Sequence, residues 1–121
     1  MAATIEKVLV IGMGKVGSLV GTLLHETGFE VTGMDAAEPQ GLAFGVIKGD
    51  VNNPESLAAS LKEVDAVVSC LPYNLNINVA HAAHAAGIHY FDLTEDVPTT
   101  KAILELSETS KGLMAPQCGL A

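Results

Sequence analysis

A glycine-rich segment near the N-terminus constrains the fold more than any other feature of the sequence. The apolar run Val8–Ile11 leads directly into the sequence GMGKVG at positions 12–17, and an apolar-periodic segment follows. Glycines spaced G-x-G-x-x-G between a strand and a helix are typical of a dinucleotide-binding turn. In such a turn Gly12 permits a sharp bend, Gly14 lets a pyrophosphate approach the backbone, and Gly17 lets the helix pack close to the strand. The unpaired N–H groups and the positive dipole of the helix N-terminus then attract phosphates.

The helix after the glycines is expected over residues 14–27, with Gly28 as a left-handed cap. Apolar residues recur in it at intervals of three and four, which predicts one buried face. That predicted face consists of Val16, Leu19, Val20, Leu23 and Leu24.

Short apolar segments alternate with helical patterns along the rest of the chain. Strands are expected at residues 7–11, 29–34, 46–47, 65–71, 89–93 and 113–117. Further helices are expected after the N-cap Asn53, at 76–86 and at 98–111. Right-handed crossovers between parallel strands then give the order 3-2-1-4-5-6. The sequence therefore predicts a single α/β domain over residues 1–121, a Rossmann-type, doubly wound, six-stranded parallel sheet. With 49% hydrophobic and only 4% aromatic residues, its core is aliphatic, as suits a sheet buried on both faces.

An acidic residue stands where the second strand ends. Asp35 lies 23 residues after Gly12 (35 − 12), the place from which a carboxylate accepts hydrogen bonds from the adenosine ribose. The following Ala36 and Ala37 offer no cation for a 2′-phosphate, which favours NAD over NADP; Lys48 is the next cation in the sequence.

Several polar residues follow the later strands. Asp50 is either an acceptor for the adenine amino group, with the Val51 backbone lining the pocket, or an ordinary turn aspartate. The segment Pro72-Tyr73-Asn74 is expected to be a loop at the carboxyl end of a central strand, where open α/β sheets bind ligands. Beyond the fifth strand, Asp96 suits a helix N-cap. Asp92 and Glu95 are expected either to serve structural roles or to face the crevice, where they would hold the ammonium groups of an amino-acid substrate.

The overall charge and the remaining motifs exclude several classes of function. A net charge of −8 disfavours nucleic acid and anionic membranes as partners. No apolar run reaches the length of a membrane span and no secretory signal is visible, so a cytoplasmic location is expected. Cys70 and Cys118 are expected to be free thiols. His81 and His84 share a helix face, but without further ligands at suitable spacing we expect no metal site.

The chain resembles the N-terminal NAD(P)-binding domain of saccharopine dehydrogenase-like oxidoreductases, a group that includes lysine 6-dehydrogenases. The resembling segments are VLVIGMGKVG (8–17), GDV with NP (49–54), VDAVVSCLPY (64–73), HYFDLTED (89–96) and APQCGLA (115–121). The resemblance implies hydride transfer between nicotinamide and the carbon of a C–N bond in an amino acid. By position, it implies cofactor contacts at Gly12, Gly14, Lys15, Val16, Gly17, Asp35, Asp50, Val51, Cys70, Leu71 and Pro72. Independently of the resemblance, the positions of Tyr73, Asn74, Asp92, Glu95 and Cys118 near strand ends suggest that they lie near the substrate. No residue is assigned as the general acid or base.

Proteins of this group have a second domain that binds substrate and mediates dimerisation. A chain of 121 residues cannot contain both domains, so we expect a truncated cofactor domain that is inactive alone and whose full-length form is a homodimer. A rival interpretation is a regulatory nucleotide-binding domain of the potassium-transport (KTN/RCK-like) type, which binds NAD or ATP without chemistry. The acidic segment after Tyr90 and the PQCGLA segment suit a substrate crevice better than a gating surface.

Overall fold

The computed structural model describes residues 4–37 and 41–118, so the last three residues of the resembling segment 115–121 lie outside it. Within the described residues the strands are β1 (Lys7–Ile11), β2 (Glu30–Asp35), β3 (Gly45–Lys48), β4 (Ala66–Ser69), β5 (His89–Asp92) and β6 (Met114–Ala115). The helices are α1 (Lys15–Thr27), α2 (Pro54–Leu61), α3 (Tyr73–Ala86) and α4 (Val97–Ser107).

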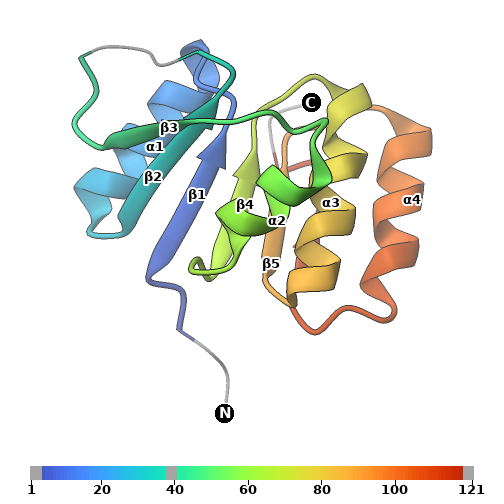
Figure 1. Ribbon diagram of the computed structural model, residues 1–121. Helices are drawn as coiled ribbons and strands as arrows, with labels where there is room; N and C mark the ends of the chain where they lie inside the picture. The colour runs from blue at the N-terminus through green and yellow to red at the C-terminus, as the bar shows by residue number, and fades with distance from the viewer. Residues whose placement is uncertain (1–3, 38–40, 119–121) are drawn as a thin grey trace.

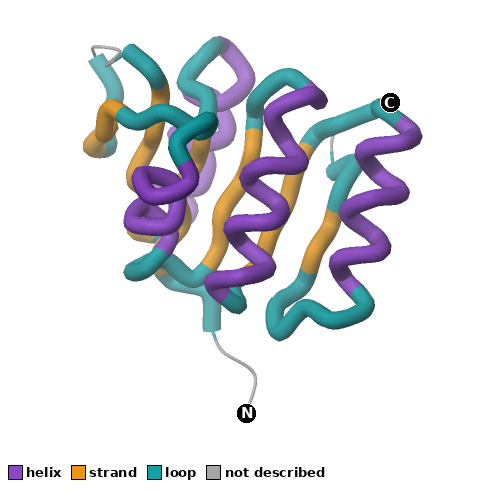
Figure 2. The backbone as a smooth tube through the Cα atoms, turned by 45° about the vertical axis from the view of Figure 1, so that its right-hand side comes forward, coloured by secondary structure: helices purple, strands orange, loops and turns teal. Residues whose placement is uncertain are grey.

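All six strands form one parallel sheet in the order β3-β2-β1-β4-β5-β6, which confirms the predicted topology. The first strand is central: Val8 pairs with Val31 on one side and with Ala66 on the other. Helices α2, α3 and α4 lie side by side on one face of the sheet, and α1 lies on the opposite face (Figures 1 and 2).

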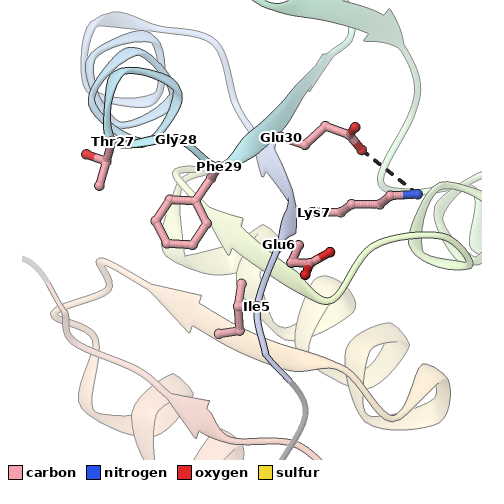
Figure 3. A pocket seen from close by; sticks show the side chains of 7 residues that line it. All are labelled: Ile5, Glu6, Lys7, Thr27, Gly28, Phe29 and Glu30. Atoms are coloured by element: carbon pink, nitrogen blue, oxygen red, sulfur yellow. Dashed lines mark ion pairs between the residues drawn. The ribbon is translucent and has the colours of Figure 1, made fainter.

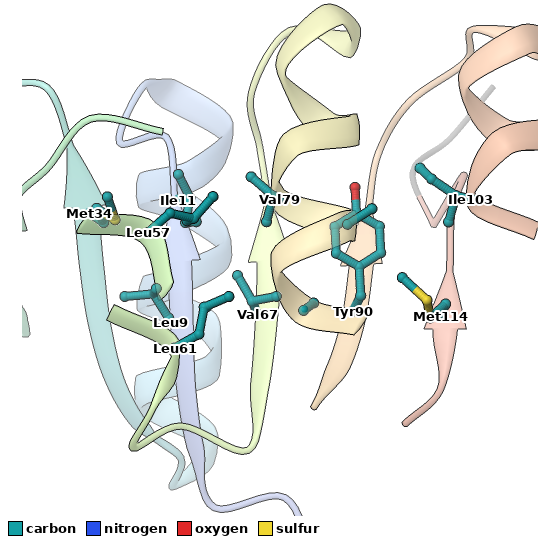
Figure 4. Close-up of a cluster of buried hydrophobic side chains, with 12 residues drawn as sticks. Leu9, Ile11, Met34, Leu57, Leu61, Val67, Val79, Tyr90, Ile103 and Met114 are labelled. Carbon is teal, nitrogen blue, oxygen red and sulfur yellow. The ribbon is translucent and has the colours of Figure 1, made fainter. Parts of the chain in front are cut away.

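The alternation of side chains along the strands produces two cores. Leu9 and Ile11 point into the larger core, beneath α2, α3 and α4, where they join Val67, Tyr90 and other buried residues (Figure 4). Val8 and Val10 point to the opposite face, into a smaller core beneath α1. Both faces of β1 are therefore apolar, as a central parallel strand requires.

The predicted buried face of α1 is wrong at three of its five positions. Val16, Leu19 and Leu23 are 54%, 58% and 53% exposed, whereas the residues of α1 that are fully buried are Gly17 and Gly21. Without side chains at these two positions the helix backbone lies close to the sheet and to Phe44, which a Cβ on Gly21 would approach to 2.5 Å. The helix is thus rotated toward its glycines, and part of its apolar stripe faces outward.

The predicted helix caps are confirmed, and most of the differences lie at element ends. Asn53 Oδ1 accepts the N–H groups of Glu55 and Ser56, each at 3.1 Å, and Gly28 ends α1 with φ = 111°. The main correction concerns α3, which begins at Tyr73 and not at Asn76. Pro72 occupies its N-cap position with φ = −55°, so the expected Pro72–Asn74 loop is instead the start of a helix.

Candidate functional site

The glycine turn follows β1 and lies between the carboxyl ends of the two neighbouring strands, β2 and β4. Gly12 has φ = 93°, a left-handed conformation that favours glycine, and its N–H donates to the carbonyl of Met34 at 2.9 Å. A Cβ at Gly12 would lie 3.0 Å from the carbonyl oxygen of Cys70. The turn is therefore enclosed between the ends of β2 and β4.

The other two glycines of the motif differ sharply in their surroundings. A Cβ on Gly17 would overlap the carbonyl oxygen of Gly12, so this position permits no side chain. A Cβ on Gly14 would meet no atom within 4 Å. Gly17 is thus required by the fold, whereas the open space at Gly14 leaves its backbone accessible to a ligand. The close packing at Gly17 agrees with the motif, while the pyrophosphate contact at Gly14 stays a prediction.

The N-terminus of α1 is suited to an anionic group. Its N-cap is Gly14, and no side chain caps the first turn. Ser18 does not serve as a cap, since its hydroxyl donates to the carbonyl of Met13 at 3.1 Å. The amides of Lys15 and Val16 in this first turn are of the kind that commonly binds phosphate.

Asp35 contacts the glycine turn directly. Its Oδ2 accepts the N–H of Met13 at 2.6 Å, and its Oδ1 accepts the N–H of Ala36 at 2.7 Å. The carboxylate is half-buried at the end of β2. On the adjacent strand, Lys48 pairs with Asp35 in register, so the cation that is distant in sequence lies beside Asp35 in the sheet.

Asp50 adopts a turn geometry. Its Oδ1 accepts the N–H of Asn52 at 2.9 Å and its carbonyl accepts the N–H of Asn53 at 3.0 Å. These two hydrogen bonds are those of a turn aspartate, one of the two interpretations of Asp50. The contact between Asp50 and an adenine amino group stays a prediction. Val51 is half-buried and packs against the larger core.

The end of β4 borders the glycine turn. The N–H of Cys70 donates to the carbonyl of Ile11 at 2.8 Å, which places Cys70 next to the turn; Leu71 is half-buried and Pro72 exposed. Burial raises the pKa of the Cys70 thiol to about 11. This thiol therefore remains protonated near neutral pH and is a poor nucleophile.

Of the two interpretations of Asp92, the structure agrees with the structural role, because the side chain does not face the crevice. Its side chain is fully buried, and it accepts hydrogen bonds from the Tyr90 hydroxyl at 2.6 Å and the N–H groups of Thr94 at 2.9 Å and Gln117 at 3.0 Å. Burial, and then the hydrogen bond to Asp92, raise the pKa of Tyr90. Asp92 therefore joins β5 to the segment that follows β6 and is not available to a substrate.

A buried hydrogen bond between polar side chains lies beside this group and was not predicted. Ser69, at the end of β4, donates to Oδ1 of Asn76 at 2.6 Å, and the Tyr90 hydroxyl lies 3.4 Å from the Asn76 carbonyl oxygen. One feature of the sequence could have indicated this hydrogen bond: Ser69 is a single polar residue within an otherwise apolar central strand. This contact joins β4 to the first turns of α3.

The remaining predicted site residues lie near the carboxyl ends of β4, β5 and β6, and they differ in exposure and in hydrogen-bond partners. Tyr73, Asn74 and Glu95 are exposed near the carboxyl ends of β4 and β5, and Asp96 caps α4 by accepting the N–H of Thr99 at 3.0 Å. Cys118 is a free thiol, as is Cys70, which confirms that prediction. Its Sγ donates to the Ala115 carbonyl at 3.1 Å, and burial is the main cause that raises its pKa.

His84 and His89 form hydrogen bonds with groups of the protein itself. A ring nitrogen of His84 lies 2.9 Å from the Thr109 hydroxyl, and Nδ1 of His89 accepts the N–H of Leu113 at 2.9 Å. In the described ranges, no three or more of the His, Cys, Asp and Glu side chains gather as a metal site would require. Nor does any helix there combine the length and apolar character needed to cross a bilayer.

Comparison with known proteins identifies the family. Residues 8–115 match the family model described as the saccharopine dehydrogenase NADP-binding domain. The chain belongs to this family. The match extends from β1 to β6 and does not favour the potassium-transport interpretation.

Solved structures agree with this fold. Apo histidine-tagged saccharopine dehydrogenase (L-Glu forming) from Saccharomyces cerevisiae superposes with a TM-score of 0.79 at 21% identity, over 95% of this chain. A short-chain dehydrogenase/reductase superfamily protein from Agrobacterium tumefaciens with bound NAD gives a TM-score of 0.71 at 20% identity, over 92% of this chain. The chain spans 27% of the length of the yeast protein and 48% of the length of the bacterial one. At these identities the likeness shows the fold alone.

Proposed function

We propose that this chain is the cofactor-binding domain of an oxidoreductase that acts at a C–N bond of an amino acid, with hydride transfer through nicotinamide. Membership of the saccharopine dehydrogenase cofactor-domain family supports the reaction class. The name of the yeast protein, saccharopine dehydrogenase, supports the choice of an amino-acid substrate.

The observation that carries the proposal is the hydrogen bond between Asp35 and the amide of Met13 beside an open Gly14. A carboxylate able to accept ribose hydroxyls and a backbone that a pyrophosphate could approach thus lie at adjacent points of one turn, which supports the proposal. The uncapped first turn of α1 adds N–H groups for the phosphates. When bound, nicotinamide would supply the hydride donor or acceptor.

The proposed cofactor is NAD. Two acceptor positions of Asp35 are used by Met13 and Ala36, and a carboxylate offers about four. The remaining ones can accept the ribose hydroxyls, whereas a 2′-phosphate would meet a negative charge. Lys48, in register with Asp35, is the residue that would favour NADP, and the family description names NADP. The bacterial protein of similar fold was solved with bound NAD, which supports the choice of NAD.

Fluorescence titration of the chain with NADH and NADPH tests the proposal. We expect NADH to bind at least about tenfold more tightly, a difference of about 1.4 kcal/mol. Asp35→Ser should reduce this preference, because it removes the charge that repels a 2′-phosphate. Lys48→Ala should leave NADH affinity unchanged, with Lys62→Ala, at the residue that follows α2, as a matched control. Tighter binding of NADPH by the wild-type chain would contradict the NAD assignment, and failure to bind either nucleotide would contradict the proposed function.

We further propose that a second domain of the protein carries the substrate site and pairs two copies. Tyr73, Asn74 and Glu95 are exposed near the carboxyl ends of β4 and β5, where they can contact an amino-acid substrate held against the cofactor domain. The 121-residue chain should therefore bind cofactor without oxidising lysine or saccharopine. Steady turnover by this chain alone, measured as NADH formation at 340 nm, would refute the requirement for a second domain.

A further inference from the structure

A groove runs between the helices α2 and α3. The two helices pack against each other on one face of the sheet (Figure 1), and each follows the carboxyl end of a strand, so they run in the same direction. The groove has a volume of about 580 Å³, which is within the range of about 300–1,000 Å³ that small-molecule sites have. Apart from Val51, its lining residues have no predicted role in binding the nucleotide or the amino acid.

The walls of this groove are largely apolar. α2 contributes Pro54, Leu57 and Ala58, and α3 contributes Ala82 and Ala85. Alanine side chains are short, so they leave open the space that longer side chains on two packed helices would fill. Since Ala58 and Ala85 are exposed, this apolar surface can be reached from solvent.

Two side chains at one level of the groove are suited to an anionic group. Lys62 and His81 both line it, and each stands eight residues after the first residue of α2 or α3 (62 − 54 = 8 and 81 − 73 = 8). Because the helices are parallel, both side chains lie about 12 Å along the helix axes from the helix starts. The Lys62 ammonium carries a positive charge, and an N–H of the His81 ring donates a hydrogen bond in either charge state.

The groove differs in sign from the rest of this acidic chain. The net charge is −8, yet no carboxylate is present among the described residues that line the groove. Glu63, next to Lys62 in the sequence, lines a separate cavity between α2 and the strands β1 and β2. The other polar lining residues, Asn52 and Asn78, carry no charge. The lining therefore favours a negatively charged head group over a positively charged one.

A cavity of about 510 Å³ at the amino ends of β1 and β2 provides the contrast (Figure 3). Its lysine, Lys7, forms an ion pair with Glu30, with charged atoms 3.9 Å apart, and Glu6 also lines it. The carboxylates there outnumber the single ammonium group. Within the part of the chain that the structure describes, no carboxylate forms such an ion pair with Lys62.

A phosphate or nucleotide is a poorer occupant of the groove. Phosphates bind to unpaired amides at helix N-termini, but the Oδ1 of Asn53 accepts the N–H groups of Glu55 and Ser56 at the start of α2. Pro54, which lines the groove, has no N–H. The first turn of α3 does not line the groove. An apolar molecule with one acidic group fits these surroundings better.

We propose that the groove between α2 and α3 binds a free medium-chain fatty acid, with its carboxylate between Lys62 and His81. Its hydrocarbon chain lies between Ala58 and Ala82, and leaving water stabilises it there. The site is separate from the glycine turn, so the proposal goes beyond the proposed function and does not depend on it.

Isothermal titration calorimetry of the 121-residue chain with decanoate tests the proposal. We expect saturable binding of one decanoate per chain. Ala58→Trp should weaken it at least about tenfold, because the indole fills the groove. Ala59→Trp is the matched control: Ala59 is the next residue and is also exposed, but it lines the cavity that contains Glu63. Its affinity should stay unchanged, and urea denaturation checks that both variants fold.

A second pair of measurements tests the head group. Replacing Lys62 and His81 together by glutamine should weaken decanoate binding at least about tenfold. Lys101→Gln, at an exposed lysine of α4, should leave the affinity unchanged. Decylamine, which has the same chain with an ammonium group, should bind the wild-type chain at least about tenfold more weakly than decanoate. This comparison needs no variant to fold.

Four results would overturn the proposal. Two are the absence of decanoate binding up to about 1 mM and equal affinities for decanoate and decylamine. The third is displacement of decanoate by NADH, which would assign the acid to the nucleotide site. The fourth is co-sedimentation of the chain with phosphatidylglycerol vesicles that Ala58→Trp abolishes, which would assign the groove to a membrane surface. Titration with NADH alone is read separately, so either proposal can fail while the other stands.

Discussion

The amide of Met13 and the carboxylate of Asp35 are 2.6 Å apart, although 22 residues separate them in the sequence. This hydrogen bond joins the glycine turn to the end of the neighbouring strand, and a bond to an ionised acceptor is stronger than one between neutral groups. It fixes the orientation of Asp35 through a contact within the protein itself. A ribose that binds here would therefore meet a carboxylate already in place, which lowers the entropic cost of binding.

Substitutions at Gly14 and Gly17 should separate binding from folding. Gly14→Val places a side chain in the open space beside the backbone of the turn, where a pyrophosphate would lie. We expect NADH affinity to fall by at least about tenfold, with a change in unfolding free energy within about 0.5 kcal/mol. NADH titration and urea denaturation measure the two effects.

Gly17→Ala is the contrasting variant. Its methyl group would overlap the carbonyl oxygen of Gly12, so the helix must move from the strand. Overpacking of this kind costs about 1–3 kcal/mol, and we expect a loss of stability at least that large.

Unchanged NADH affinity in Gly14→Val would show that the pyrophosphate lies elsewhere.

Removal of the Tyr90 hydroxyl should destabilise the domain. Tyr90→Phe leaves the buried carboxylate of Asp92 with its two backbone donors, Thr94 and Gln117, and without its hydroxyl donor. A hydrogen bond to a charged group contributes about 1.5–3 kcal/mol, and we expect a loss in that range by urea denaturation. Tyr73→Phe is the control, since Tyr73 is 56% exposed and should change stability by less than about 0.5 kcal/mol. Equal effects of the two substitutions would refute the role of this hydrogen bond.

Asp65 should contribute to the acid sensitivity of the domain. Its Oδ2 accepts the N–H groups of Glu6 and Lys7, each at 2.9 Å, and these backbone hydrogen bonds lower its pKa below the ordinary value of 3.8. A carboxylate whose pKa is depressed on folding stabilises the folded state above its unfolded pKa, and this stabilisation disappears as the pH falls through the folded pKa. Asp65→Asn should therefore be less stable than the wild type at neutral pH, and the difference should shrink below about pH 4.

Urea denaturation between neutral pH and about pH 3 measures this difference. Because backbone hydrogen bonds are the main cause of the shift, the difference should persist in about 1 M salt, where charge–charge interactions at the surface are screened. A stability difference that is independent of pH would contradict the assignment.

The sequence was sufficient for the topology because the strands are short apolar runs with clear boundaries. Gly28, Asn53, Gly87 and Asp96 each mark a helix end by a local rule, and the structure has caps at all four. Asp35 could be located for the same reason, since its distance from Gly12 reflects the length of one helix and one strand.

The sequence was a poor guide wherever the outcome depended on contacts between distant elements. The burial of α1 is set by Gly17 and Gly21, which carry no apolar signal, so the periodicity of Val16, Leu19 and Leu23 pointed to the wrong face. The place of Asp92 at the end of a strand left both a structural role and a role in the crevice open. Its burial depends on Tyr90 and on Gln117, 25 residues later, and no local pattern reveals that partner.

The pairing of β1 with β4 has a consequence for synthesis of the chain. The glycine turn is made early, but one side of it is formed by Cys70, whose N–H donates to Ile11. While only the first half of the chain has left the ribosome, residues 8–11 lack one of their two neighbouring strands and expose an apolar edge. The glycine turn therefore cannot be completed progressively along the growing chain, and a nascent chain that stops before Ser69 should lack a formed turn.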